Sequence, residues 1–177
     1  SGSQELAEKV LKAPSLARFS FVAQEKPLGL GHAVLMAKDL VGDEPFVVIL
    51  PDDLVWNTEG ATEQMLRVFE QYGASVVAVE PVKKEAVSNY GVVASSPAGD
   101  RVHKIKGVVE KPDPESAPSN LAIVGRYILT PEIFSCLQLT KPGAKGEIQL
   151  TDGMTLLLER QAMYAYRFQG TRYDGGT

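Results

Sequence analysis

Hydrophobic positions along the chain follow two kinds of pattern, apolar stripes at helical spacing and continuous β-branched runs. The stripes predict helices over residues 4–13, 30–40, 61–72 and 150–160. The runs predict strands over residues 19–22, 46–50, 75–79, 121–129 and 164–168. The run at 46–50 is typical of a strand that is covered on both faces. Because strands and helices alternate in the first half, that half favours a parallel, doubly wound α/β arrangement.

The middle of the chain has a different pattern. Residues 90–94 and 102–106 are strand-like and a Pro97-Ala-Gly-Asp turn lies between them, so they predict a hairpin. Because a hairpin adds antiparallel strands, we expect a Rossmann-like mixed α/β sheet flanked by helices. We expect a single domain over residues 1–177 that is incomplete at both ends, since residues 173–177 look like a loop with no closing helix.

Composition and charge narrow the classes of function. The 177 residues are 44% hydrophobic and 23% charged, as in ordinary soluble globular proteins. A net charge of −4 provides no basic footprint for nucleic acid or an anionic membrane, and no apolar run is long enough to span a bilayer. We therefore expect a cytoplasmic protein with neither of these partners. Cys136 is the only cysteine, which excludes an internal disulfide and a multi-cysteine metal cluster and favours a buried structural thiol.

Two carboxylates directly follow the strand-like run at 46–50. Ligands of open α/β sheets bind outside the carboxyl ends of the strands, which is where Asp52 and Asp53 stand. Carboxylate oxygens there can hold Mg²⁺, which usually bridges to substrate phosphates. The alternative is that an aspartate after a strand only caps the next turn. The pairing of two carboxylates shifts the balance modestly toward a metal site.

Two further patterns are weak when taken alone. The glycines of Gly29-Leu-Gly31 suit close approach of a flat ring to the backbone, but Val34 stands where a dinucleotide fingerprint needs a small residue, so an oxidoreductase is disfavoured. Lys111 suits a phosphate and Glu110 suits sugar hydroxyls, although such a pair is more often a solvated surface. No Gly-x-Ser-x-Gly pattern is present, which weakens a hydrolase reading.

Taken in order, these patterns and several others form a specific signature. The motifs are Gln24 with Pro27–Ala33, Leu50–Asp53, Asn89–Val92, Val109–Pro112, Ser119–Tyr127, Gly146–Asp152 and Tyr173–Gly176. In this order they resemble the bacterial UTP–glucose-1-phosphate uridylyltransferases, which belong to the sugar nucleotidyltransferases. The resemblance covers nearly the whole chain from about Phe21 onward. It implies a nucleotide-diphospho-sugar transferase fold and the formation of UDP-glucose and pyrophosphate from UTP and glucose 1-phosphate, with Mg²⁺.

The resemblance also implies roles for particular residues. Asp52 and Asp174 match the two metal-holding aspartates, and Lys111 matches the contact to the sugar phosphate. The substrate-binding positions that it implies are Gln24 and Gly29 for the uracil, Gly91 and Glu110 for the glucose, and Val124 and Gly125 for the wall of the sugar pocket. Glu147, Gln149 and Asp152 receive no defined role beyond bracing the pocket.

One part of the family pattern has no counterpart in this sequence. Family members start with a strand that leads into a glycine-rich loop with Gly-Thr-Arg and a downstream Pro-Lys-Glu, which holds the triphosphate, and no such segment exists in the 177 residues. We therefore expect these residues alone to be catalytically silent, with exposed sheet edges that favour self-association. The family commonly forms homo-oligomers, and the resemblance implies the same here.

Three other functions stay open on the sequence. The first is a related transfer, such as thymidylyl transfer, and the wording of motifs 28–33 and 147–152 favours uridylyl transfer over it. The second is a non-catalytic module that binds a sugar nucleotide. The third is a structural or interaction domain, which the joint presence of Asp52, Lys111 and Asp174 argues against.

Overall fold

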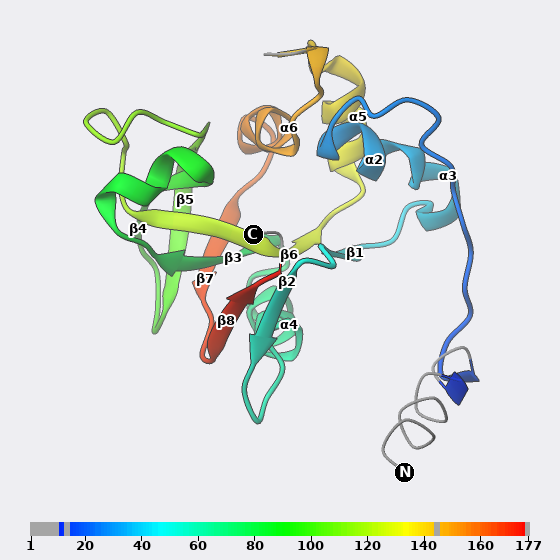
Figure 1. Cartoon of the computed structure of the whole chain (residues 1–177), viewed down its shortest axis with the longest axis horizontal. Coiled ribbons are helices and arrows are strands. Elements are labelled where there is room, and N and C mark those ends of the chain that lie inside the picture. The colour runs from blue at the N-terminus through cyan, green and yellow to red at the C-terminus, as the bar shows by residue number, and fades with distance from the viewer. Residues whose placement is uncertain (1–10, 13–14, 144–145, 176–177) are drawn as a thin grey trace.

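The computed structural model describes residues 11–12, 15–143 and 146–175. Its main sheet contains the strands β1 (Phe46–Ile49), β3 (Ser75–Pro81), β4 (Gly91–Pro97), β5 (Val102–Glu110), β6 (Leu121–Leu129) and β7 (Met163–Arg167). These six strands lie in the order β1-β6-β3-β7-β5-β4, and β4 also contacts β6 (Figure 1). The sheet is mixed, as predicted. Strands β1 and β3 of the first half run in the same direction, as predicted, but they are not neighbours, because β6 inserts antiparallel between them. Strands β3 and β7 are the one adjacent parallel pair within the described residues.

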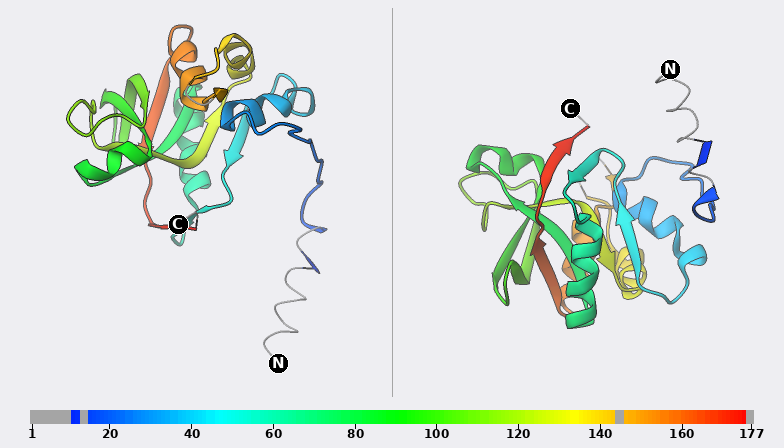
Figure 2. Two further views of the ribbon diagram at one scale, coloured as in Figure 1. Left: turned by 45° about the horizontal axis from the view of Figure 1, so that its top comes forward. Right: turned by 90° about the horizontal axis from the view of Figure 1, so that it is seen from below.

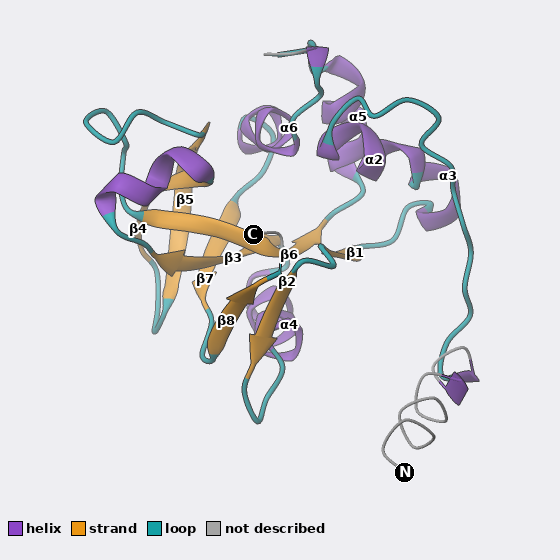
Figure 3. Ribbon diagram, in the orientation of Figure 1, coloured by secondary structure: helices purple, strands orange, loops and turns teal. Residues whose placement is uncertain are grey.

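Helices cover both faces of this sheet (Figure 3). The helices on one face are α2 (Leu30–Met36), α5 (Glu132–Leu139) and α6 (Leu150–Leu158), while α4 (Ala61–Tyr72) lies on the other. Side chains of β3 alternate between the two layers, since Val77 and Val79 join the core under α5 and α6 whereas Val76 and Ala78 join the core under α4. The short elements α3 (Lys38–Val41) and η2 (Lys84–Asn89) complete the helical part.

Helix α4 has the residue bounds that its apolar stripe predicts. Its buried residues Ala61, Gln64, Met65 and Val68 recur at the spacing of one helix face. The helix ends at Gly73, which adopts a left-handed conformation with φ of 60° that glycine tolerates best. Strand β6 and the hairpin of β4 and β5 are confirmed in the same way.

Three expectations about the first fifty residues fare differently. No strand forms at 19–22, where Phe21 is 93% exposed and the backbone is irregular. The helix predicted over 4–13 lies largely outside the described residues. Strand β1 is not covered on both faces, because Val47 and Ile49, which alternate along it and so share one face, are exposed.

A second, smaller sheet is the feature that the sequence patterns miss. Strands β2 (Asp53–Trp56) and β8 (Thr171–Asp174) form an antiparallel pair, here called the β2–β8 ribbon (Figure 2). The prediction of a loop from residue 173 is therefore wrong for Tyr173 and Asp174, which pair with a strand far earlier in the chain. Four-residue strands are too short to show a periodicity of their own.

Two further observations concern expectations from composition. Cys136 is buried in α5, and this burial raises the pKa of its thiol, as suits a structural cysteine. Within the described residues, no helix is both long enough and apolar enough to cross a bilayer.

Candidate functional site

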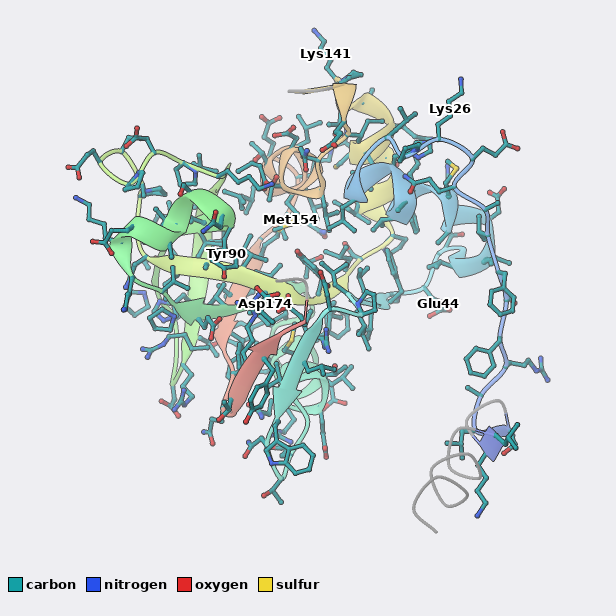
Figure 4. All side chains as sticks on the ribbon, in the orientation of Figure 1. Lys26, Glu44, Tyr90, Lys141, Met154 and Asp174 are labelled. Atoms are coloured by element: carbon teal, nitrogen blue, oxygen red, sulfur yellow. The ribbon has the colours of Figure 1, made fainter. Side chains whose placement is uncertain are left out.

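One cavity brings together most of the residues that the sequence singles out. It has a volume of about 430 Å³, and Asp52, Lys111 and Asp174 all line it. Gly91, Glu110 and Gly125 line the same cavity. Tyr90 and Asp174, both lining residues, lie near the centre of Figure 4, where the ribbon meets the main sheet.

One end of the β2–β8 ribbon places the two candidate metal-holding aspartates at the cavity, since Asp174 is the last residue of β8 and Asp52 directly precedes β2. Asp53 lies opposite Asp174 in the register of the ribbon. The N–H of Gly175 donates to the carbonyl of Asp52 at 2.7 Å, which holds residues 52 and 174 at the same ribbon end. Both aspartates are exposed and line the cavity.

The two adjacent aspartates have different environments. Asp53 is only 7% exposed, accepts a hydrogen bond from the N–H of Gly125 at 2.7 Å, and forms an ion pair with Arg172. Its carboxylate is therefore bound by the protein itself, which is a structural role, although not the capping of the next turn that was the alternative for this motif. Asp52 has no such buried partners among the described contacts and is the carboxylate of this motif that stays open to solvent.

Arg172 is a lining residue to which sequence reasoning gave no role. Besides Asp53, its guanidinium contacts Glu80 at 2.9 Å and Asp174 at 3.5 Å, and it lies 5.2 Å from the centre of the Tyr90 ring. Burial by itself would lower the pKa of Arg172, but hydrogen bonds to Tyr90, Asp53 and Glu80 outweigh burial and raise it. The signal available in the sequence was its place in Arg172-Tyr-Asp174, on the same strand as the metal candidate.

Glu110 and Lys111 lie at the cavity wall where β5 ends. Lys111 adopts a φ of 45°, which is uncommon for a residue other than glycine, and its N–H donates to the carbonyl of Tyr90 at 3.0 Å. Strained backbone of this kind concentrates at functional sites. The Glu110 carboxylate accepts a hydrogen bond from the hydroxyl of Thr151 at 3.0 Å, while the Lys111 ammonium lies 3.8 Å away from it. The helix α6 thus orients Glu110 and leaves Lys111 exposed to the cavity.

Two glycines keep the cavity open. A Cβ on Gly91 would lie 2.8 Å from the methyl carbon of Thr151, and one on Gly125 would lie 2.7 Å from a carboxylate oxygen of Asp53. Val124 does not join them, because its side chain is 1% exposed and packs in the core under α4. Strand alternation explains the difference, since Ile123 and Gly125 face the cavity and the residue between them faces the opposite layer.

The predicted uracil contacts form a neighbouring group. The Gln24 amide donates to the carbonyl of Gly29 at 3.1 Å and lies 2.9 Å from Nδ1 of His32. Neither Gln24 nor Gly29 lines the cavity, although Leu30, which follows Gly29, does. The φ of 96° at Gly29 and a clash of any Cβ there with the carbonyl of Ile148, at 2.8 Å, both favour glycine at this position.

The three residues without an assigned role separate into two groups. Glu147 and Gln149 line the cavity, and the Gln149 amide donates to the Glu147 carboxylate at 2.7 Å. Asp152 lines a different groove together with Lys141. Bracing of the cavity is therefore open to the first two residues but not to Asp152.

The donor set fits one kind of metal site better than another. Across the part of the chain that the structure describes, no group of three or more histidine, cysteine, aspartate or glutamate side chains could enclose a metal ion. Asp52 and Asp174 offer two carboxylates at an open cavity. Such a pair suits Mg²⁺, which keeps several waters and is often bound through one or two carboxylates together with substrate phosphates.

Comparisons with known proteins agree with one another. A family model described as nucleotidyl transferase matches residues 2–177. The chain is 45% identical to the UTP–glucose-1-phosphate uridylyltransferase of Bacillus subtilis, over 99% of this chain and 60% of that protein. It is also 45% identical to the protein of the same name from Pseudomonas aeruginosa, over 90% of this chain and 58% of that protein.

A solved structure gives the same picture. The crystal structure of a UDP-glucose pyrophosphorylase complexed with UDP-glucose is 43% identical and superposes with a TM-score of 0.95, covering 100% of this chain and 68% of that one. The mixed α/β fold described above is therefore that of a portion of these structures. The chain spans about 60% of the length of the curated relatives that it matches.

Proposed function

Since this chain belongs to the nucleotidyl transferase family, we propose that its cavity serves the transfer of a uridylyl group from UTP to glucose 1-phosphate. The products are UDP-glucose and pyrophosphate. The observation that carries the proposal is that Asp52, Lys111 and Asp174 line one cavity together with Gly91 and Glu110. The relatives named for this reaction, at 45% identity, support it.

The reaction joins two anions without a covalent enzyme intermediate. A phosphate oxygen of glucose 1-phosphate attacks the α-phosphorus of UTP, and the bond from that phosphorus to the oxygen bridging to the β-phosphorus breaks. Pyrophosphate leaves with the bond electrons. The attacking monoester is largely a dianion near neutral pH, because its second pKa is about 6, so no general base is needed. Positioning and charge neutralisation therefore carry most of the rate enhancement.

Side chains of the cavity supply this positioning. Lys111, exposed at the cavity wall, contacts the phosphate of glucose 1-phosphate and offsets its charge. Glu110, held by the Thr151 hydroxyl, accepts hydrogen bonds from the sugar hydroxyls. The bare backbone at Gly91 and Gly125 leaves room for the sugar ring beside them.

Asp52 and Asp174 are the residues that would hold Mg²⁺, and when bound the ion supplies Lewis-acid stabilisation of charge on the phosphoryl oxygens. Gln24 and Gly29, which are hydrogen-bonded to each other, lie beyond Leu30 and would receive the uracil ring at that side of the cavity. Residues 1–177 act as one domain in this proposal, since both core clusters share a single sheet.

Binding of the product tests the proposal directly. Isothermal titration of the purified chain with UDP-glucose in the presence of Mg²⁺ is expected to show saturable binding at one site. Lys111→Met is expected to weaken it by about 10-fold to 100-fold, because a hydrogen bond to a charged group contributes roughly 1.5–3 kcal/mol. Lys84→Met, at an exposed ion pair with Glu115, is the matched control and should bind as the unsubstituted chain does. Absence of UDP-glucose binding by the unsubstituted chain would refute the proposal.

Turnover separates uridylyl transfer from the other functions. The 177 residues alone are expected to bind UDP-glucose without forming it, because they contain no counterpart of the family's loop that holds the triphosphate. A chimaera in which this chain replaces the matching segment of the Bacillus subtilis relative is expected to form UDP-glucose, and to use UTP in preference to dTTP. A folded chimaera that binds UDP-glucose but forms none would favour the non-catalytic binding module.

A further inference from the structure

We infer that Arg172 is a positioning residue that couples cation binding to sugar-nucleotide binding in this cavity, an inference that rests on the proposed function. Its guanidinium fixes the β2–β8 ribbon against the main sheet so that Asp52 and Asp174 face the same ligand. Arg172 itself is not assigned to contact the reacting atoms.

The need for such a residue follows from the topology. The ribbon, which ends at Asp174 and begins directly after Asp52, is a sheet of its own, and within the described residues it makes no ladder hydrogen bonds to the six-stranded sheet. An antiparallel pair of two short strands has little independent stability in water. Its placement over the cavity therefore depends on side chains that cross from the ribbon to the main sheet.

Three side chains of the described residues make these crossings: the Asp53 carboxylate, which accepts from the N–H of Gly125 in β6, and arginines from two strands. From the main sheet, Arg126 of β6 donates to the carbonyl of Leu50 at 3.0 Å and to the carbonyl of Asp53. From the ribbon, Arg172 of β8 reaches Glu80 of β3 at 2.9 Å and the Tyr90 hydroxyl at 3.3 Å. Arg172 lies two residues before Asp174 on the same strand, so of the two arginines it has the more direct effect on the orientation of the Asp174 carboxylate.

The contacts of Arg172 are unequal in a way that suits this role. Its pairs with Asp53 and Glu80 are close, and the Arg172 side chain is only 10% exposed. Its contact with Asp174 is looser, at 3.5 Å, and the Asp174 side chain is 33% exposed. The guanidinium is thus anchored by the two inner carboxylates, whose charges it offsets, and only leans against the third. Arg172 thus orients Asp174, which lines the cavity, toward it.

The geometry requires a guanidinium and not merely a positive charge. Arg172 uses Nε for Asp53, Nη1 for Glu80 and Tyr90, and Nη2 for Asp174. A lysine ammonium carries its three N–H donors on one nitrogen and cannot span these partners at once. Replacement by lysine therefore separates the contribution of charge from that of geometry.

The experiment measures coupling, which a general loss of stability would not change. UDP-glucose affinity of the chain is measured by calorimetry with and without Mn²⁺, at a temperature well below the unfolding midpoint. A cation held between the aspartates and the diphosphate should raise the affinity of the unsubstituted chain by about 10-fold or more, within the usual range of such coupling. In Arg172→Lys and Arg172→Met the ratio of UDP-glucose affinities with and without Mn²⁺ is expected to fall below about 2-fold. Mn²⁺ binding without sugar nucleotide, followed by electron paramagnetic resonance, should stay equal or become tighter, because positive charge is lost or displaced.

Two further variants make each outcome decisive. Arg67→Met, on α4, removes an exposed ion pair with Glu59 and should keep the full ratio of UDP-glucose affinities with and without Mn²⁺. Glu80→Gln weakens one anchor of Arg172 outside the cavity lining and should lower the ratio partway, which keeps the test valid if Arg172→Met does not fold. A full ratio in both Arg172 variants, or equal weakening of both ligands with the ratio unchanged, would overturn the inference. UDP-glucose binding without any Mn²⁺ dependence in the unsubstituted chain would overturn it and leave the proposed function standing, whereas no UDP-glucose binding at all removes both.

Discussion

Replacement of Gly91 by alanine tests whether the backbone at the start of β4 must stay bare. An added Cβ would lie 2.8 Å from the methyl carbon of Thr151, 3.3 Å from a carboxylate oxygen of Glu110 and 3.4 Å from Cδ1 of Ile123. The first of these contacts is too short to persist unchanged, so either Thr151 moves or the strand and its other neighbours are strained. Overpacking by one methyl group of this kind costs about 1–3 kcal/mol.

Where this cost appears depends on how the cavity relaxes. If Thr151 stays in place, the strain remains in the folded protein and lowers the free energy of unfolding. If Thr151 moves, its hydrogen bond to Glu110 is lost, and Glu110 must be reoriented when the sugar binds. The loss in unfolding free energy and the loss in UDP-glucose binding free energy are therefore expected to sum to about 1–3 kcal/mol. Carried entirely by binding, the upper value is a loss of about 100-fold in affinity.

A second substitution provides the rescue. Thr151→Ser removes the methyl carbon that clashes but keeps the hydroxyl that donates to Glu110. Urea unfolding and calorimetric titration with UDP-glucose are measured for both single variants and for the double variant. Gly91→Ala/Thr151→Ser should recover most of the summed loss. A summed loss below about 0.5 kcal/mol for Gly91→Ala, or a double variant no better than Gly91→Ala, would refute the steric account.

The remaining predictions concern stability and cation binding. Asp53→Asn should lower the free energy of unfolding by about 3 kcal/mol, because it breaks a buried ion pair, whereas Asp52→Asn should leave urea unfolding unchanged and abolish Mn²⁺ coupling to UDP-glucose. Gln64→Leu should cost about 2–3 kcal/mol, because the buried amide makes hydrogen bonds to Glu59 and Gln169, while Gln71→Leu on the exposed face of α4 should change the unfolding free energy by less than about 0.5 kcal/mol. Burial raises the pKa of Tyr127, so its neutral form stabilises the fold fully below the unfolded pKa of about 10, and this stability is lost as pH rises further. Tyr127→Phe should therefore reduce the alkaline loss of unfolding free energy by up to about 1.4 kcal/mol per pH unit above pH 10, and an unchanged slope would contradict the assignment.

Local patterns predicted those elements whose boundaries are set by their own residues. The stripe of α4 and the nine apolar-rich residues of β6 have the bounds that their sequence indicates. Register and strand order depend instead on distant partners. The run at 46–50 has the composition of a doubly covered strand, yet β1 lies at the sheet edge because its neighbour β6 comes from residues 121–129. No property of residues 46–50 alone distinguishes these two cases.

The same distinction, between what local residues determine and what distant partners determine, applies to the candidate site. Motif order identified Asp52, Lys111 and Asp174, which line one cavity, and it also named Val124, whose side chain packs under α4. A contact made by the backbone of residue 124 would not depend on its side chain, so the motif does not reveal where the Val124 side chain points. The motif therefore locates a segment of β6 at the cavity. The alternation of side chains along the strand then decides that residues 123 and 125, and not Val124, face the cavity.

Asp52 and Asp53 show why long-range pairing must be known before roles can be assigned. The two residues are chemically identical and adjacent, so every argument from strand ends and carboxylate chemistry applies equally to both. They differ because β2 begins at Asp53 and pairs with β8, which places Arg172 against Asp53 and leaves Asp52 outside the ribbon. A single cation cannot be offered both carboxylates if the protein already uses one of them to hold the ribbon. The different roles of the two aspartates are thus set by Arg172, which lies far along the chain. If Arg172 cannot pair with Asp53, the two carboxylates no longer differ in this way.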